Sequence, residues 1–240
     1  MVQFALWITS STPTACEVLG SQSGADVLVV DGQHGAFGPD EGLALVTACT
    51  RTSAKCAVRV SDWRAEAEIC RYIDAGAEYV ICPMVNSQAS CEEFCRHCFY
   101  PPTGTRSYGP YRHRLGGQPF SPTTANQRVV PLAMIETKLA LGNLDEILQV
   151  ESLGGVFIGP NDLGLSMGHA PTSAPEGEVL RAIHHVLARA QALGKRAGIF
   201  CTDAKTAKAM AGLGFDFVVF GTDLGLATAG AKLQLANCKL

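Results

Sequence analysis

Short runs of apolar and β-branched residues alternate along the chain with stretches whose apolar residues recur at helical spacing. This alternation predicts βαβ units and a parallel sheet. The helical stretches include 66–74, 138–149, 178–193 and 204–213. We expect eight strands, at Phe4–Thr9, Asp26–Asp31, Lys55–Val60, Tyr79–Met84, Val130–Glu136, Gly155–Gly159, Ala197–Cys201 and Asp216–Gly221.

A glycine shortly precedes every second strand of this series, at Gly24, Gly76, Gly154 and Gly214. Glycine commonly ends a helix just before the chain enters a buried strand. Its recurrence at alternate strands favours a closed (β/α)8 barrel, whose interior layers come from alternate strands. An open, doubly wound sheet is the alternative. Since the strands occupy the whole of residues 1–240, we expect one domain.

Composition narrows the class of protein. The 240 residues are 47% hydrophobic and 17% charged, which excludes a disordered or fibrous chain. A net charge of −3 indicates no nucleic-acid partner. Apolar runs such as 27–30 and 217–220 are far shorter than the ~20 residues of a membrane span. Without a signal-peptide pattern at the N-terminus, we expect a soluble cytoplasmic protein.

The ten cysteines do not suggest a disulfide framework. Several, such as Cys56 and Cys201, lie in apolar runs, where a reduced thiol behaves as a small hydrophobic group. Cys91, Cys95 and Cys98 have the spacing of a radical iron–sulfur site. On a helix the same spacing forms a single buried stripe, which is the interpretation that we favour.

The segment 101–127 has neither helical nor strand periodicity and is rich in Gly, Pro, Ser and Thr. Loops of this length in a compact domain are usually functional or disordered. Its aromatic and basic residues are Arg106, Tyr108, Tyr111, Arg112 and Arg114. We expect the segment at the end of the barrel that carries the chemistry, as a lid over an anionic substrate rather than an RNA-binding loop.

Polar residues follow several otherwise apolar strands, where a barrel gathers its functional groups. Glu136 ends the fifth strand and Asp162 follows the sixth. Both are hard oxygen ligands without a neighbouring Cys or His motif, so they favour Mg²⁺ or Mn²⁺ with water ligands. Co²⁺ or a similar ion is a further candidate. The alternative is that both carboxylates cap helices.

Three other ionisable residues require an explanation. Arg59 has no acidic neighbour in its strand, so burial would demand a carboxylate or ligand partner. His34 follows a glycine-containing turn and is suited to general-base catalysis near neutral pH, although loop histidines are often structural. Asp74 lies near the end of a predicted helix, where a negative charge is unfavourable, so we expect a partner such as a histidine.

The motifs, taken in order, resemble the HpcH/HpaI family of class II, metal-dependent pyruvate aldolases, which act on 4-hydroxy-2-oxo acids. The resemblance covers nearly the whole chain. It implies a TIM barrel of the phosphoenolpyruvate/pyruvate type with an exchanged C-terminal helix, assembled as a trimer of dimers. The motifs are Asp31-Gly-Gln-His-Gly35, Val58-Arg59, Ile73-Asp-Ala-Gly-Ala77, Pro83-Met-Val85, Tyr100-Pro-Pro-x-Gly-x-Arg106, Ile135-Glu-Thr137 and Phe157-Ile-Gly-Pro-x-Asp-Leu163.

By this resemblance the metal ligands are Glu136 and Asp162, and Arg59 holds the pyruvyl oxygen beside the metal. Metal and arginine together would stabilise the enolate formed when the C3–C4 bond breaks. No Schiff-base lysine is needed in such a reaction. The turn that matches the binding site of the pyruvate carboxylate comprises Gly159, Pro160 and Asn161.

The resemblance also implies roles on the aldehyde side. His34 matches the base, which takes the proton of the 4-hydroxyl group through a water molecule, and Asp74 matches the carboxylate that pairs with it. Asp31 matches an acidic residue near the base. Trp7 resembles a wall of the aldehyde pocket. The implied reaction is the cleavage or formation of 4-hydroxy-2-oxo acids from pyruvate, or another 2-oxo acid, and an aldehyde.

Three departures from the family pattern leave alternatives open. Gln33 stands where a glutamate is common, and Met134 stands where a glutamine is usual. The sequence 106–109 resembles the branch that includes macrophomate synthase, which decarboxylates oxaloacetate to the same enolate. The alternatives are therefore an oxaloacetate decarboxylase and a catalytically impaired barrel that only binds a 2-oxo acid.

Overall fold

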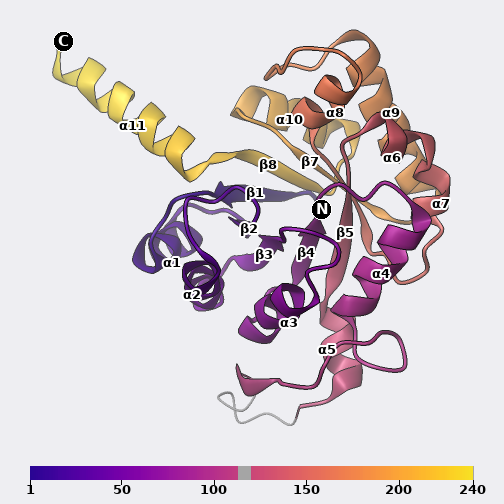
Figure 1. Ribbon diagram of the computed structural model, residues 1–240. Coiled ribbons are helices and arrows are strands. Elements are labelled where there is room, and N and C mark those ends of the chain that lie inside the picture. The colour runs from indigo at the N-terminus through magenta and orange to yellow at the C-terminus, as the bar shows by residue number, and fades with distance from the viewer. Residues whose placement is uncertain (113–119, 240) are drawn as a thin grey trace.

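The computed structural model describes residues 1–112 and 120–239. Its strands form a closed, all-parallel barrel in which each strand pairs with the next and β8 pairs with β1 (Figure 1). This arrangement confirms the predicted barrel and excludes the open sheet. The strands are β1 (Gln3–Ile8), β2 (Val27–Asp31), β3 (Lys55–Arg59), β4 (Tyr79–Cys82), β5 (Val130–Ile135), β6 (Gly155–Ile158), β7 (Arg196–Phe200) and β8 (Phe217–Thr222).

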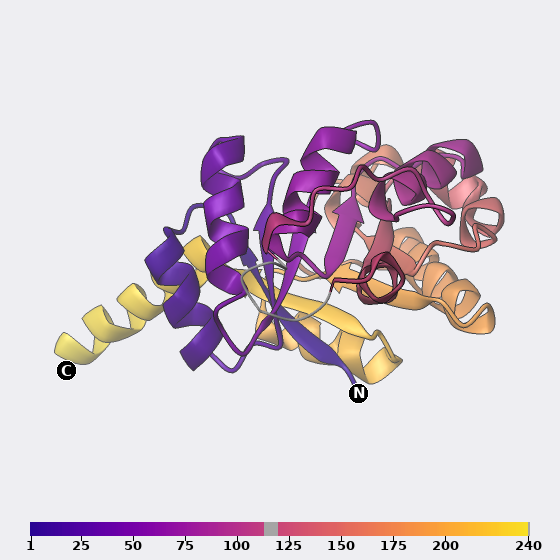
Figure 2. The ribbon, with the colours of Figure 1, turned by 90° about the horizontal axis from the view of Figure 1, so that it is seen from below.

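Helices connect the strands and surround the barrel (Figure 2). They are α1 (Pro13–Gln22), α2 (Pro39–Cys49), α3 (Glu66–Ala75), α4 (Gln88–Cys98), α5 (Pro122–Arg128), α6 (Lys138–Gly142), α7 (Leu144–Leu148), α8 (Pro160–Ser166), α9 (Gly177–Ala192), α10 (Ala204–Leu213) and α11 (Asp223–Cys238). The helix predicted over 138–149 is interrupted at Asn143, whose side-chain N–H donates to the carbonyl of Asn86 at 2.8 Å. This bond ties the break to the loop after β4.

The strands are apolar because both of their faces are buried. All five residues of β2 are buried, as expected for a parallel strand covered by helices. Inside the barrel, the Phe157 ring lies 5.7 Å from Trp7 and 5.9 Å from Phe217 between ring centroids. At the amino end, the Tyr79 hydroxyl donates to Gln3 at 2.8 Å. The interior is therefore filled by side chains, as in other barrels of this size.

Eight of the ten cysteines are buried, while Cys70 is partly buried and Cys238 is exposed. Cys91, Cys95 and Cys98 lie on α4 and are fully buried, which confirms the helical stripe over the cluster interpretation. All ten cysteines are free thiols. Burial raises the pKa of Cys98 well above its usual range, so this thiol stays protonated and unreactive.

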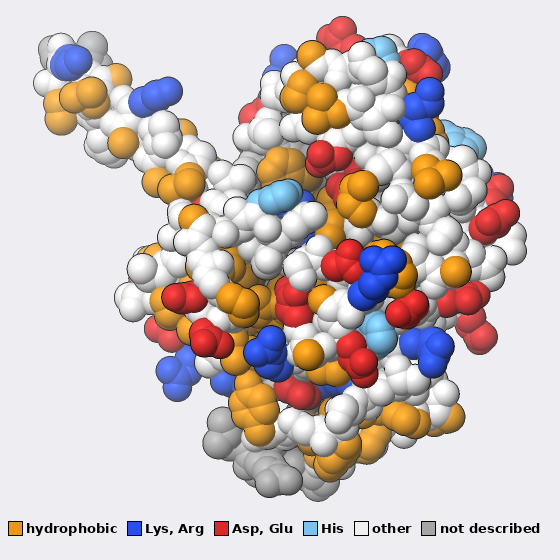
Figure 3. All heavy atoms as spheres, in the orientation of Figure 1, with side chains coloured by type: hydrophobic (Ala, Val, Ile, Leu, Met, Phe, Trp, Pro, Cys, Tyr) orange, Lys and Arg blue, Asp and Glu red, His pale blue; other side chains and the backbone are white. Residues whose placement is uncertain are grey.

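Helix α11 projects away from the barrel in two perpendicular views (Figures 1 and 2). Asp223 is its one buried residue, while hydrophobic side chains lie along its surface (Figure 3). Its exposed leucines are Leu224, Leu226, Leu233 and Leu235. In the described part of the chain, no helix is long and apolar enough to cross a membrane.

The described parts of the segment 101–127, residues 101–112 and 120–127, lie at the amino end of the barrel, so their predicted position at the catalytic end is wrong. Helix α4 follows β4 and returns the chain to the amino end before the segment begins. Arg106 accordingly lines a cavity together with Glu78 and Val129, which directly precede β4 and β5. Arg114 lies outside the described residues.

Candidate active site

A cavity of about 220 Å³ opens at the carboxyl end of the barrel. The ends of seven of the eight strands, and the loops that follow them, contribute to it. Most of the predicted site residues lie here together, although they are dispersed in the sequence. The lining residues are Trp7, Thr9, Asp31, His34, Arg59, Met134, Phe157, Gly159, Pro160, Asn161, Asp162, Phe200 and Thr222.

Arg59 has the buried carboxylate partner that its sequence position required. Asp31 lies directly beside it on the neighbouring strand. The arginine donates from Nε to Asp31 Oδ1 at 2.9 Å and from Nη2 to Oδ2 at 2.6 Å. Burial alone would raise the pKa of Asp31, but the arginine outweighs it and holds the pKa below its ordinary value. The pair is therefore ionised, and the orientation of the guanidinium is fixed.

Asp31 also organises the residues around it. The indole Nε1 of Trp7 donates to Asp31 Oδ2 at 2.9 Å, which sets the plane of the aromatic wall. The backbone N–H groups of Gln33 and His34 donate to Oδ1 at 3.2 and 3.1 Å. The Asp31 carboxylate thus contacts the backbone of His34, not its imidazole, and shapes the turn that presents the imidazole. The predicted proximity of Asp31 to the base takes this form.

His34 itself lies exposed at the rim of the cavity. Its turn is closed by the N–H of Gly35, which donates to the carbonyl of Asp31 at 3.0 Å. The N–H of Ala36 donates to the carbonyl of Thr9 at 2.7 Å. The histidine is therefore carried on a turn held from both β2 and the loop after β1, with its side chain accessible to a ligand.

Glu136 is buried behind the cavity, with 3% of its surface exposed. Its Oε1 accepts the N–H of Met84 at 2.7 Å, and Met84 adopts the left-handed φ of 54°. Burial raises the pKa of Glu136, and the negative charge of nearby Asp162 raises it further. A second carboxylate close to a buried one is typical of a cation site.

Gly159 leaves room for that arrangement. A Cβ at this position would lie 2.8 Å from Glu136 Oε2, closer than real Cβ contacts allow. In the described part of the chain no three His, Cys, Asp or Glu side chains are grouped as metal ligands. Two carboxylates suit Mg²⁺ or Mn²⁺, which take one or two protein carboxylates and keep oxygen ligands from water or substrate. The donor set therefore fits such an ion.

Asn161 and Pro160 belong to the first turn of α8, which follows β6 directly. The side-chain oxygen of Asn161 accepts the N–H of Thr172 at 3.0 Å, so it fixes the loop after α8. Asn161 and Gly159 both line the cavity. The position agrees with the predicted carboxylate-binding turn, whose role stays a prediction.

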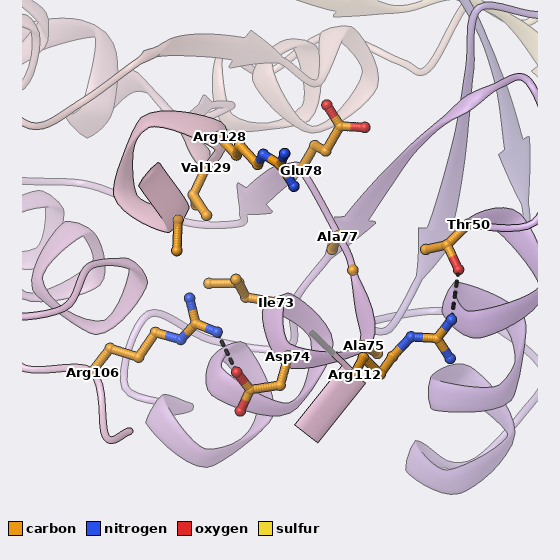
Figure 4. Close-up of a pocket in the computed structure, with 12 residues that line it drawn as sticks. Thr50, Ile73, Asp74, Ala75, Ala77, Glu78, Arg106, Arg112, Arg128 and Val129 are labelled. Atoms are coloured by element: carbon orange, nitrogen blue, oxygen red, sulfur yellow. Dashed lines mark hydrogen bonds and ion pairs between the residues drawn. The ribbon is translucent and has the colours of Figure 1, made fainter. Parts of the chain in front are cut away.

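Asp74 lies elsewhere in the chain. It lines a second cavity of about 410 Å³ at the amino end of the barrel, where it forms an ion pair with Arg106 (Figure 4). On the other side of this cavity Arg112 donates to Thr50 at 3.2 Å. The expected partner of Asp74 exists but is an arginine, because the end of α3 and the His34 turn are at opposite ends of the barrel. Pairing of Asp74 with His34 within one chain is therefore wrong.

Several cavity residues were not foreseen from the sequence. Thr9 and Thr222 stand where β1 and β8 end, and Phe157 and Phe200 add apolar walls. The two threonines carried a usable signal, because they follow apolar strands at the end of the barrel where functional groups gather. The phenylalanines looked like ordinary core residues.

Comparison with known proteins supports an enzymatic site. Residues 3–229 match the model of the family described as HpcH/HpaI aldolase/citrate lyase. A hydroxypyruvate/pyruvate aldolase of Rhizorhabdus wittichii is 41% identical over 217 residues, which cover 89% of this chain and 85% of that protein. A 2-keto-3-deoxy-L-rhamnonate aldolase of Salmonella gallinarum is 33% identical over 240 residues, 99% of this chain and 89% of that protein.

Solved structures share the fold at lower identity. An HpcH/HpaI aldolase/citrate lyase family protein from Burkholderia cenocepacia superposes with a TM-score of 0.89 at 22% identity, covering 100% of this chain and 95% of that one. Macrophomate synthase gives 0.86 at 21%, covering 99% and 85%. The protein CitE of Mycobacterium tuberculosis, in complex with magnesium and pyruvate, gives 0.58 at 19%, covering 92% and 85%.

Proposed function

Since the chain belongs to the HpcH/HpaI aldolase/citrate lyase family, we propose that it is a metal-dependent class II pyruvate aldolase. It is an enzyme of the aldolase class, a carbon–carbon lyase. Its proposed reaction is the cleavage or formation of 4-hydroxy-2-oxo acids from pyruvate, or another 2-oxo acid, and an aldehyde. The relatives named as hydroxypyruvate/pyruvate and 2-keto-3-deoxy-L-rhamnonate aldolases support this class of substrate.

The observation that carries the proposal is the convergence of Arg59, Asp162 and the 159–161 turn on one cavity. Asp31 engages two of the five N–H groups of Arg59, so three remain for an oxygen of the 2-oxo acid. A positive charge fixed before the reaction stabilises an enolate oxygen without reorganisation. In this proposal the turn with Gly159 and Asn161, which lines the same cavity, would bind the carboxylate.

Glu136 and Asp162 are the proposed ligands of Mg²⁺ or Mn²⁺, with Co²⁺ or a similar ion as a further candidate. A divalent ion bound there would act as a Lewis acid toward the oxygens of a 2-oxo acid. The clearance at Gly159 and the magnesium and pyruvate bound by the Mycobacterium protein support this assignment. Gly159 is required because Glu136 must approach the backbone closely.

His34 is the proposed base. In cleavage it removes the proton of the 4-hydroxyl group through a water molecule, while the C3–C4 bond breaks and its electron pair passes into the enolate. It returns the proton in the addition direction. The aldehyde would lie against Trp7 and Phe200, whose rings are 5.3 Å apart between centroids. These apolar walls limit access of bulk water to the reacting atoms.

The proposed assembly is a trimer of dimers in which α11 is exchanged between subunits. The exposed leucines of α11 and the half-buried Phe4 and Phe220, on adjacent strands β1 and β8, support the exchange. Asp74 cannot reach His34 of its own chain, so we assign their predicted pairing to two different subunits. The free, mostly buried thiols agree with the proposed location in a reducing cytoplasm. We also propose that residues 1–240 form a single domain, since the eight strands of the barrel occupy nearly the whole chain.

Decarboxylation of oxaloacetate is a second candidate, because it uses the same oxyanion stabilisation by Arg59. Met134 is apolar and lines the cavity, so it offers no side-chain hydrogen bond to a longer 4-hydroxy-2-oxo acid. This absence favours the shorter oxaloacetate as substrate. The third candidate is a barrel that binds a 2-oxo acid without turnover. It predicts neither aldol cleavage nor decarboxylation.

The decisive experiment is an assay of pyruvate release from a 4-hydroxy-2-oxo acid, and of oxaloacetate decarboxylation, before and after EDTA treatment and restoration with Mg²⁺ or Mn²⁺. Calorimetric titration of the ion and of pyruvate measures binding separately. Glu136→Gln should lose ion binding and activity together, whereas His34→Ala should keep the ion and lose aldol cleavage. Binding without ion-dependent turnover would favour the inactive barrel, and retained cleavage in His34→Ala would refute the base.

A further inference from the structure

Asp223 is a buried carboxylate outside the proposed catalytic set. It is the first residue of α11, and 8% of its surface is exposed. Five donors surround it, four of them from the loop after β1, more than 200 residues away in the sequence. Thr9 donates to Oδ1 from its backbone N–H at 3.0 Å and from its hydroxyl at 2.7 Å. Ser10 N and Ser11 Oγ donate to Oδ2 at 3.0 and 2.7 Å.

A carboxylate is the one side chain of this size that satisfies this set. Each oxygen of Asp223 receives a backbone N–H of the loop, from Thr9 on one side and Ser10 on the other. An asparagine has one acceptor oxygen, so its NH₂ group would face one of those N–H groups in either orientation. The hydroxyl groups could rotate to accept a bond, but a backbone N–H cannot. Loss of the carboxylate must therefore displace the loop.

The same loop holds the turn that carries His34. The carbonyl of Thr9 accepts the N–H of Ala36 at 2.7 Å, two residues beyond the histidine. One peptide thus links Asp223 on one side to the His34 turn on the other. Asp31 fixes the beginning of this turn, and Thr9 fixes its end. A displaced Thr9 would leave the turn held at one end.

We infer that Asp223 is a positioning residue for His34, acting through the main chain of Thr9. The inference rests on the proposed function of His34 as base. It also gives the first residue of α11 a role in the site. The helix that projects from the barrel begins at Asp223, the residue that orders the His34 turn. Displacement of a catalytic group by about 1 Å can cost ~100-fold in rate.

Two reactions of the proposed enzyme separate this role from a general structural one. In aldol cleavage, the 4-hydroxyl proton passes to the base as the C3–C4 bond breaks. In oxaloacetate decarboxylation, the bond to the departing carboxylate breaks, CO₂ leaves, and the electron pair forms the same enolate without removal of a hydroxyl proton. A misplaced base therefore slows the first reaction and spares the second.

The test compares Asp223→Asn with the unmodified Mg²⁺-loaded protein in both assays. We expect kcat for aldol cleavage to fall by at least about tenfold and kcat for decarboxylation to stay within about twofold. The matched control is Asp216→Asn, at the amino end of β8, where the carboxylate accepts the N–H of Ala197 at 2.9 Å. This variant should leave the ratio of the two reactions unchanged.

Ser11→Ala is the second variant, because it removes one hydroxyl donor and leaves Asp223 and the cavity lining in place. It should lower the ratio of cleavage to decarboxylation in the same direction, by a smaller factor, even if Asp223→Asn does not fold. Equal loss of both reactions in the variants, or unchanged cleavage in Asp223→Asn, would overturn the inference. Absence of both reactions in the unmodified protein would instead refute the proposed function.

Discussion

Arg59 and Asp31 are cross-strand neighbours that form a two-point ion pair in the floor of the cavity, with Nε–Oδ1 and Nη2–Oδ2 distances of 2.9 and 2.6 Å. Both side chains are nearly inaccessible to solvent, with 10% and 2% exposed. Solvent screening of the pair is therefore small, and its geometry fixes the Arg59 guanidinium beside the proposed substrate.

Asp31→Asn should weaken 2-oxo acid binding and stability together. The amide would leave the buried guanidinium without a counter-charge, which typically costs about 3–5 kcal/mol in the free energy of unfolding. We expect KM for the 2-oxo acid to rise at least about tenfold as Arg59 loses its fixed orientation. Steady-state kinetics and urea unfolding check this. Asp26→Asn is the control, because Asp26 accepts the N–H of Phe4 at the exposed amino end; equal effects in both would contradict the assignment.

Gly159→Ala should abolish divalent-ion binding. The new Cβ would stand 2.8 Å from Glu136 Oε2 and must push that carboxylate aside. In Gly164→Ala, on the same helix–loop unit, the nearest atom is Val179 Cγ2 at 3.7 Å, an ordinary contact. Calorimetric titration of Mn²⁺ should therefore show lost binding in the first variant and unchanged binding in the second. Unchanged binding in Gly159→Ala would remove the steric argument for the site.

Mixed oligomers should reveal whether Asp74 serves a neighbouring subunit. When each variant is assayed separately, His34→Ala and Asp74→Asn should both lack aldol cleavage. If a site combines the two residues from different chains, co-refolding equal amounts should restore about a quarter of the sites by random assortment. A mixture of His34→Ala and Glu136→Gln is the control, since both residues serve the cavity of one chain and no intact site forms. Lack of recovery in the first mixture would show that the pairing does not cross the interface.

Helix α11 should hold the oligomer together through its leucines. Leu226 and Leu233 are seven residues apart on one face and are 40% and 61% exposed. Replacing both with glutamate should convert the proposed six-chain assembly into smaller species, measured by light scattering against a chain mass of 25.3 kDa. Lys232→Glu, which changes charge without removing apolar surface, should keep the assembly. A monomeric unmodified protein would contradict the exchanged helix.

The stability contributed by Asp223 should depend on pH. Burial alone would raise its pKa, but the hydrogen bonds from Thr9, Ser10 and Ser11 outweigh it and hold the pKa below the ordinary value of 3.8. A lowered pKa in the folded state stabilises the protein above the unfolded value, and this contribution is lost as the pH falls through the folded value. The difference in unfolding free energy between the unmodified protein and Asp223→Asn should thus be constant from pH 7 to about 5. It should shrink below about pH 4, and an unchanged difference there would refute the assignment.

The strands could be predicted because burial on both faces makes each of them a continuous apolar run. All eight observed strands begin and end within two residues of their predicted bounds. The break at Asn143 could not be predicted, since its cause is the carbonyl of Asn86, 57 residues earlier. The segment 101–127 was predicted at the wrong end of the barrel. Helix α4 lies between β4 and this segment and returns the chain to the amino end.

The site was predictable where function follows from position at a strand end, as for Arg59 and Asp162. It was not predictable where a role depends on distant partners. Asp223 meets Thr9 across 214 positions, and no local pattern distinguishes it from a carboxylate at the start of any helix. Asp74 was recognised as needing a partner, but only the fold shows that Arg106 provides it.

The packed interior of the barrel has a kinetic consequence. Below the cavity, the described side chains of Phe157, Phe217 and Tyr79 fill the space to the amino end, so ligands enter and leave at the carboxyl end. A molecule bound beside Glu136 must then depart after one bound nearer the rim. Cleavage would follow an ordered sequence, aldehyde first and 2-oxo acid last. In product-inhibition experiments the 2-oxo acid would compete with the substrate, whereas the aldehyde would not.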